Sequence, residues 1–150
     1  MSEIFVDADA CPVKAEIIRV AERHGIVAHI VSNSGFRTNA NPLIRNVLVS
    51  DKFDAADDWI VARAGPGDIV ITADIQLADR CLKAGAEVIG NTGKPFTENS
   101  IGTALAMREL SSQLRDMGEI RGGGPIFSQA DRSRFLNALE AAVQRAKRRN

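Results

Sequence analysis

Short apolar runs alternate with amphipathic segments over residues 1–90 of the chain. The runs have strand length, and their near-continuous apolar character is typical of parallel strands buried on both faces. Between them, apolar residues recur at the three-to-four-residue spacing of a helix. Asp54 stands where it can cap the second helix. The predicted strands are residues 3–8, 26–32, 45–50, 68–73 and 86–89, and the predicted helices are residues 12–24, 55–64 and 75–84.

This alternation favours the α/β class, with a mostly parallel sheet of about five strands between two helix layers. The resulting three-layer α/β/α architecture is expected to have the first and fourth strands at its centre. The order of the strands would then reverse between these two. Ligands in such sheets bind beyond the carboxyl ends of the strands, at the point of reversal.

The last third of the chain changes character. A helix is predicted over about residues 98–117, followed by a loop at Gly122–Pro125. Ser128 and Asp131 have the spacing of a capping box and predict the start of a final helix. We therefore expect one domain over residues 1–150, with a core at about 1–90 and a helical extension from about 97. The apolar face of the final helix comprises Phe135, Leu136, Leu139, Ala142, Val143 and Ala146.

Two carboxylates, Asp7 and Asp9, follow the first predicted strand. Asp is a favoured N-cap residue, so capping of the helix that begins near Pro12 would explain one of them. It does not explain a pair, because like charges held together repel each other unless a cation lies between them. We therefore interpret the pair as part of a functional site at the end of the strand.

Further acidic residues follow the third and fourth predicted strands. Asp57 shares a helix face with Ile60 and Val61, where a carboxylate is costly unless it is paired, hydrogen-bonded or bound to metal. Asp58 competes with Asp57 for the inward position, and the sequence leaves that choice open. Asp74 ends the fourth strand, where capping of the next helix explains it equally well.

Mg²⁺ and Mn²⁺ prefer oxygen ligands, usually a few carboxylates completed by water and substrate phosphate. Carboxylates at the ends of separate strands can provide such ligands without a compact sequence motif. The hypothesis is a Mg²⁺ or Mn²⁺ site held by Asp7, Asp57 and Asp74, with Asp9 as a further ligand or orienting an attacking water. Three basic residues in loops or at helix starts are the candidates to meet substrate phosphate, namely Arg37, Lys94 and Arg132.

The composition narrows these interpretations. Hydrophobic residues make up 45% and charged residues 25% of the 150-residue chain, which is the balance of an ordinary globular domain. Lys plus Arg equal Asp plus Glu at 19 each, so bulk charge gives no argument for nucleic-acid binding. The two cysteines form no paired motif, so neither a zinc site nor a disulfide framework is indicated. No signal peptide or membrane-spanning run is evident, so we expect a cytoplasmic protein.

Several stretches form a distinctive combination, and together they resemble the YaiI/YqxD family of bacterial proteins. The resemblance covers nearly the whole chain, and it implies no established activity. The stretches are Asp7–Lys14, Phe53–Ile60, Gly67–Ile75 and Gly122–Pro125, with Asp131, Arg132 and Phe135 after them.

The acidic residues are also similar to those of PIN-like domains, whose nuclease members hold Mg²⁺ or Mn²⁺ in an acidic cluster. Asp7 matches the acid after the first strand, and Asp57 matches the acid before an Ala-rich helix turn. Thr72-Ala-Asp74 resembles the Thr-x-Asp that ends the fourth strand. Many PIN-like nucleases carry another acid two residues further on, where this chain has Gln76. The resemblance implies a PIN-like sheet.

Three functions remain open at this point. The leading hypothesis is a metal-dependent phosphodiesterase that acts on RNA through Asp7, Asp9, Asp57 and Asp74. The first alternative is a non-catalytic module that binds RNA or protein. The second is a phosphatase of the haloacid dehalogenase type, in which Asp7 attacks phosphate and Asp9 is the acid/base.

Overall fold

The computed structural model of the protein describes residues 2–8, 11–33, 41–52, 54–103 and 127–149. Residues 98–103 are helical and follow the last strand. The other elements are β1 (Ile4–Asp7), α1 (Lys14–His24), β2 (Ala28–Ser32), β3 (Ile44–Leu48), α2 (Ala55–Val61), β4 (Ile69–Ile71), α3 (Ile75–Lys83), β5 (Glu87–Ile89), β6 (Pro95–Phe96) and α5 (Gln129–Arg149).

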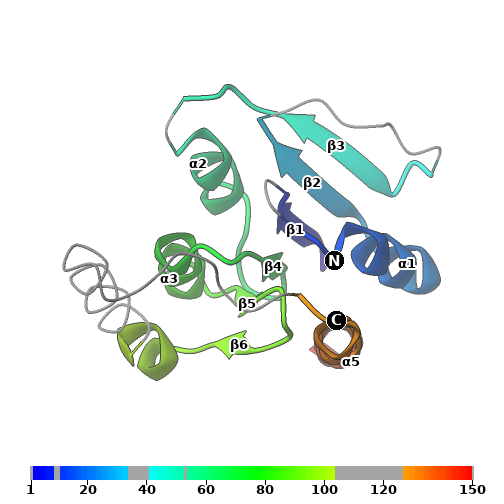
Figure 1. The fold of residues 1–150 in the computed structure, drawn as a ribbon. Helices are drawn as coiled ribbons and strands as arrows, with labels where there is room; N and C mark the ends of the chain where they lie inside the picture. Colours follow the sequence, from blue (N-terminus) through cyan, green and yellow to red (C-terminus); the bar gives the residue numbers. More distant parts are fainter. Residues whose placement is uncertain (1, 9–10, 34–40, 53, 104–126, 150) are drawn as a thin grey trace.

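The strands form one six-stranded sheet in the order β3-β2-β1-β4-β5-β6 (Figure 1). The first five strands along the chain are parallel, and β6 alone runs antiparallel to its neighbour β5. The predicted central position of β1 and β4 is confirmed, and the strand order reverses between them. The carboxyl ends of the parallel strands therefore meet at one edge, next to the point of reversal.

Alternate side chains of the strands enter two separate cores. Ile4 and Val6 of β1 lie in one core, whereas Phe5 lies in the other. Strand β4 repeats the pattern, with Ile71 in the first core and Val70 in the second. Because successive strand residues point to opposite faces, both faces of the sheet are buried. Helices α1 and α5 cover one face and α2 and α3 the other, so the predicted three-layer α/β/α fold is confirmed (Figure 1).

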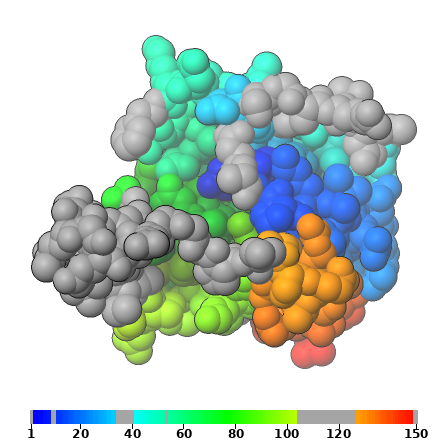
Figure 2. Space-filling view, viewed as in Figure 1, coloured from blue at the N-terminus to red at the C-terminus, as the bar shows by residue number. Residues whose placement is uncertain are grey.

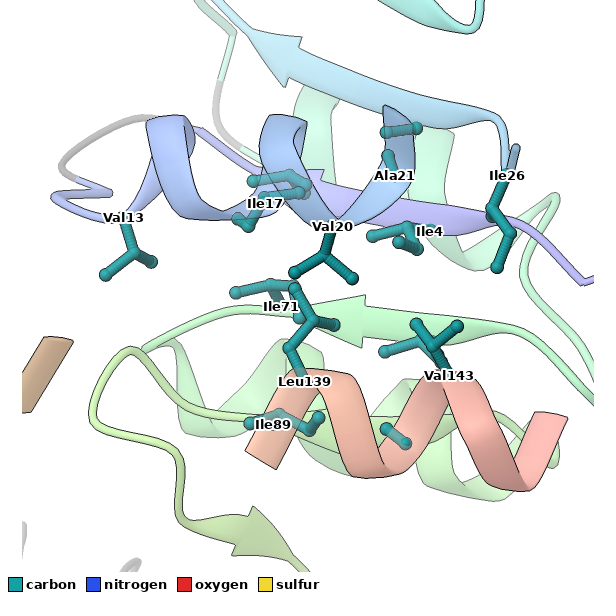
Figure 3. Close-up of a cluster of buried hydrophobic side chains, with 14 of the residues drawn as sticks. Ile4, Val13, Ile17, Val20, Ala21, Ile26, Ile71, Ile89, Leu139 and Val143 are labelled. Atoms are coloured by element: carbon teal, nitrogen blue, oxygen red, sulfur yellow. The ribbon is translucent and has the colours of Figure 1, made fainter. Parts of the chain in front are cut away.

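Helix α5 is part of the main core. Its side chains Leu139 and Val143 belong to one buried cluster with Ile17 and Val20 of α1, and Leu139 points toward Val20 (Figure 3). The orange surface of α5 lies directly below the blue surface of α1 in the space-filling view (Figure 2). The predicted capping box starts this helix, because the Ser128 backbone N–H donates to Asp131 at 3.0 Å and the Asp131 N–H donates to the Ser128 hydroxyl at 3.1 Å. Helix α5 thus covers one face of the sheet as part of the hydrophobic core.

Two local predictions are wrong. Asp54 stands at the N-cap position of α2, but its side chain makes no capping hydrogen bond and its backbone is left-handed, with φ 64°. Strand β6 was not predicted, because a two-residue strand that begins with Pro95 has neither strand length nor apolar alternation. The prediction of a helix over residues 98–117 is supported at residues 98–103, and its remainder and the Gly122–Pro125 loop lie outside the described residues.

Candidate active site

A cavity of about 470 Å³ opens at the carboxyl ends of the strands. The end of strand β1, the segment after β4, helix α2 and the loop before α2 all contribute to its wall. Asp7, Asp57 and Asp74, which lie far apart in the sequence, therefore converge on one space. We call it the acidic cavity, and its lining residues are Asp7, Asn33, Ser50, Asp51, Lys52, Asp54, Ala55, Ala56, Asp57, Ala73, Asp74 and Asn91.

The register of the sheet places Asp7 beside Thr72. Val6 pairs with Ile71 in the parallel ladder between β1 and β4, so the next residue of each chain segment lies at the same level. The buried Thr72 hydroxyl donates to Asp7 Oδ2 at 3.0 Å and accepts the backbone N–H of Asp74 at 2.9 Å. One hydroxyl thus holds the two strand ends together and orients the Asp7 carboxylate.

Asp74 is the N-cap of α3. Its Oδ1 atom accepts the backbone N–H groups of Gln76 at 2.9 Å and Leu77 at 3.2 Å. The capping explanation for Asp74 is therefore correct. Both hydrogen bonds use the same carboxylate oxygen, so capping and a place in the wall of the acidic cavity are compatible.

Capping does not account for Asp7. Helix α1 begins at Lys14, and its N-cap position is occupied by Val13, which makes no side-chain capping bond. The Asp7 carboxylate instead accepts from Thr72 on the neighbouring strand.

The structure resolves the choice between Asp57 and Asp58. Asp57 lines the acidic cavity, whereas Asp58 is exposed and pairs with Arg80 at 3.0 Å. Partial burial, together with the charges of Asp74, Asp7 and Asp54, raises the pKa of the Asp57 carboxyl from 3.8 to about 6. Arg80 counteracts this rise only in part. The acidic cavity therefore brings carboxylates close enough together for their charges to oppose the ionisation of Asp57.

The segment before α2 adds strain and one positive charge to this wall. Asp54 is the only non-glycine residue with a positive φ in the described ranges. Such a conformation costs about 1–3 kcal/mol and persists where surrounding structure enforces it. Lys52 stands in the same segment, so an ammonium group accompanies the carboxylates around the acidic cavity.

The remaining predicted site residues fall elsewhere. Asp9 and Arg37 lie outside the described residues. Lys94 is exposed and lines a neighbouring cavity. Arg132 is occupied with the fold, because its Nη1 atom donates to the carbonyl of Pro12 at 2.8 Å and pairs with Glu16 at 3.2 Å.

Sequence reasoning missed several polar members of this wall. Asn33 comes directly after β2 and Asn91 two residues after β5, so their position at the end of a parallel strand was the available signal. Ser50, Asp51 and Lys52 carry no such signal, because they belong to the irregular segment between β3 and α2.

The donor chemistry of the acidic cavity suits a hydrated divalent cation. Within the described ranges, no three His, Cys, Asp or Glu side chains are grouped so that they could hold one metal ion together. Mg²⁺ needs only one or two carboxylates, since it keeps several of its waters. Asp7 and Asp74, joined through Thr72, provide two strand-end carboxylates of this kind.

No helix in the described part of the chain is both long and apolar enough to cross a membrane.

The chain matches the model described as "Uncharacterized BCR, YaiI/YqxD family" over residues 5–145. It is 60% identical over 149 residues to a UPF0178 protein of Parvibaculum lavamentivorans, covering 99% of this chain and 98% of that protein. A UPF0178 protein of Sphingopyxis alaskensis is 61% identical over 146 residues, covering 97% and 95%. One from Rhizobium etli is 55% identical over 144 residues, covering 96% and 93%. No solved structure matches the chain. The protein therefore belongs to the YaiI/YqxD family.

Proposed function

We propose that the protein is a metal-dependent phosphodiesterase that hydrolyses RNA in the acidic cavity. The observation that carries the proposal is the convergence of Asp7, Asp57 and Asp74 at the reversal point of a parallel sheet. Open α/β sheets bind their ligands at this place. The acidic residues resemble those of PIN-like nucleases, which supports the same chemistry.

The electrostatics of the acidic cavity supports a bound cation. Asp57 carries a raised pKa because Asp74, Asp7 and Asp54 repel its charge and because it is partly buried. A divalent cation between these carboxylates would remove that repulsion. Asp7 and Asp74 would hold Mg²⁺ or Mn²⁺, and Asp57 would contact the waters that the ion keeps. The ion would supply an activated water and stabilise negative charge on the phosphoryl oxygens.

The protein's own residues have separate tasks in this proposal. Thr72 fixes the orientation of Asp7 through its hydrogen bond, so the carboxylate is placed before the substrate arrives. The capping bonds fix Asp74 in the same way. Lys52 provides a positive charge at the wall of the cavity, where it would attract a phosphate of the substrate.

Calorimetric titration with Mn²⁺ and Mg²⁺ tests the cation site. We expect saturable binding by the unaltered protein and its loss in Asp7→Asn and Asp74→Asn. Asp58→Asn is the matched control, because Asp58 is exposed beside Arg80 and outside the cavity lining. Loss of binding in the control as well, or its retention in both cavity variants, would contradict the site.

Cleavage of a labelled single-stranded RNA in the presence of Mn²⁺ then tests the reaction. We expect turnover that is abolished by chelation and by Asp7→Asn. Trapping of a phospho-aspartyl group on Asp7 would instead identify a phosphatase of the haloacid dehalogenase type. RNA binding that survives removal of the acids, without cleavage by any variant, would identify a non-catalytic binding module.

A further inference from the structure

A second cavity lies beside the acidic cavity and has different chemistry. Ala73 and Asn91 line both, so the two spaces adjoin. The second cavity has a volume of about 540 Å³, and Ile75, Phe96 and Phe127 contribute its apolar wall. We call it the aromatic cavity. Its size lies within the range of cavities that bind small organic groups.

The hairpin that joins β5 to β6 forms much of the wall of the aromatic cavity. Gly93, in the turn between β5 and β6, has φ +89°, and a Cβ atom there would lie 2.6 Å from the carbonyl oxygen of Arg134. The turn therefore rests directly on the backbone of α5. The Gly90 N–H donates to the Lys94 carbonyl at 2.9 Å and closes the hairpin. The yellow-green surface near β6 and the orange start of α5 lie next to each other at the lower edge of the molecule (Figure 2).

Lys94 provides a positive charge at this cavity. It is exposed, and within the described residues its ammonium group makes no hydrogen bond or ion pair. It also lines an adjoining depression together with Arg134. The Arg134 guanidinium is already paired with Asp131 at 2.5 Å, so Lys94 is the cation available to an anionic ligand.

We infer that the aromatic cavity receives an unpaired nucleobase of the substrate, and that the substrate is therefore a single-stranded nucleic acid. This inference rests on the proposed function, because it places the neighbouring phosphate in the acidic cavity. Aromatic faces bind bases by stacking, and an apolar cavity accepts a base only when the base has left its duplex. Lys94 then pairs with the phosphate of the nucleotide whose base contacts Phe127.

The arrangement of charge matches this occupant. Carboxylates that can take a divalent cation line one cavity, and an apolar wall with a lysine lines the other. A nucleotide chain presents a phosphate and a planar base at alternating positions along its length. Asn91 and Thr92 add amide and hydroxyl groups that can hydrogen-bond to the edge of a base.

Binding of labelled oligonucleotides tests the inference without requiring turnover. Fluorescence anisotropy is measured at 4 °C in Mg²⁺, with the strand checked for integrity afterwards. The probes are a single-stranded RNA, the same RNA in a duplex, and a series in which one base at a time is replaced by an abasic residue. We expect the single strand to bind at least about 10-fold more tightly than the duplex, and one abasic position to weaken binding by about 5- to 100-fold.

Substitutions at Phe127 connect this effect to the cavity. Phe127→Ala is expected to bind intact and abasic strands with equal affinity. Phe127→Trp keeps an aromatic face and should still bind the intact strand more tightly than the abasic one. Lys94→Gln is expected to weaken intact and abasic strands alike and to reduce the dependence on salt. Leu48→Ala is the control, since Leu48 is an exposed side chain on β3 and outside the cavity lining.

Three outcomes would overturn the inference. They are equal affinity for intact strands and every abasic strand, equal affinity for single strand and duplex, and unchanged discrimination in a folded Phe127→Ala variant. The abasic series uses the unaltered protein, so the test does not depend on whether a variant folds. Cleavage of single strands and duplexes at the same rate would refute this inference and leave the proposed hydrolysis standing. Base-dependent binding without metal-dependent cleavage would refute the proposed hydrolysis and leave the nucleobase site standing.

Discussion

Asp57→Asn is expected to stabilise the folded protein at neutral pH. Asp57 is partly buried and faces the charges of Asp74 and Asp7, so its ionised form is less favourable in the folded chain than in the unfolded one. Asparagine keeps the size of the side chain and removes the charge. Replacing a residue of the candidate site should therefore raise the free energy of unfolding.

The size of the effect follows from the pKa. The rise from 3.8 to about 6 corresponds to about 3 kcal/mol at ~1.36 kcal/mol per pKa unit. The Asp57 side chain is only partly buried, so solvent screens much of this energy and we expect a net gain of about 1 kcal/mol. For a chain of this length, that gain raises Tm by about 2–4 °C.

The gain depends on pH in a defined direction. Below about pH 4 the Asp57 carboxyl is protonated in both the folded and the unfolded chain, so it contributes no penalty. As the pH rises through about 6, the folded chain must ionise Asp57 against its neighbours, and the unaltered protein loses this stability. The Asp57→Asn variant should therefore be more stable than the unaltered protein at pH 7.5 and equally stable near pH 4.

Urea denaturation at the two pH values, followed by circular dichroism, measures both points. Asp58→Asn is the matched control, because it removes a charge from the same helix turn but takes it from an exposed pair with Arg80. Both substitutions lose a favourable interaction with the N-terminus of α2. Asp58→Asn also loses the exposed pair with Arg80, which contributes at most about 1 kcal/mol. An Asp57→Asn variant no more stable than the control at pH 7.5 would refute the electrostatic reasoning.

Three further predictions concern the support of the site and the core. Thr72→Val removes the hydroxyl that orients Asp7, and should lower the free energy of unfolding in urea by about 1–3 kcal/mol, whereas Thr72→Ser should restore it. Gly93→Ala places a methyl group 2.6 Å from the α5 backbone and should lower Tm. Gly102→Ala should not, because no atom of the described residues lies within 4 Å of the added methyl group. Burial raises the pKa of the Cys81 thiol to about 11, so alkylation by iodoacetamide at pH 8 should be slow in the folded protein and fast in urea, and equal rates would contradict this.

The order of the elements was predictable because the signals for it are local and physical. Apolar runs of strand length and helical spacing of apolar residues follow from burial on both faces of a parallel sheet. Gly25 ends α1 in the left-handed conformation, which glycine adopts more readily than other residues. Strand β6 was missed because Pro95 and Phe96 owe their extended conformation to pairing with Val88 and Ile89, a contact that two residues do not reveal.

The sequence predicts which acidic residues belong to the candidate site, but it does not predict how their side chains are oriented. Asp7 and Asp74 follow the two central strands, and a parallel sheet brings such ends together. The inward position of Asp57 depends on the direction in which α2 crosses the sheet, and Asp58 has an almost equivalent helical pattern. The role of Thr72 needed the register of β1 against β4, because a hydroxyl inside an apolar strand otherwise indicates only a buried polar residue.

The unfavourable features of this fold gather around the acidic cavity. Asp57 holds a charge that its surroundings disfavour, and Asp54, close to it in the chain, holds a left-handed backbone. The carboxylates of Asp7 and Asp74 have hydrogen-bond partners, since Thr72 bridges the two residues and the capping bonds hold Asp74. One substitution of Asp57 by a neutral residue would remove the unfavourable charge, and one substitution of Asp54 by glycine would remove the backbone strain. Selection for stability alone would favour both changes. Strain beside a rigid, preoriented pair of carboxylates is instead the arrangement expected where a ligand completes the structure. Added Mn²⁺ should therefore stabilise the unaltered protein more than it stabilises Asp57→Asn.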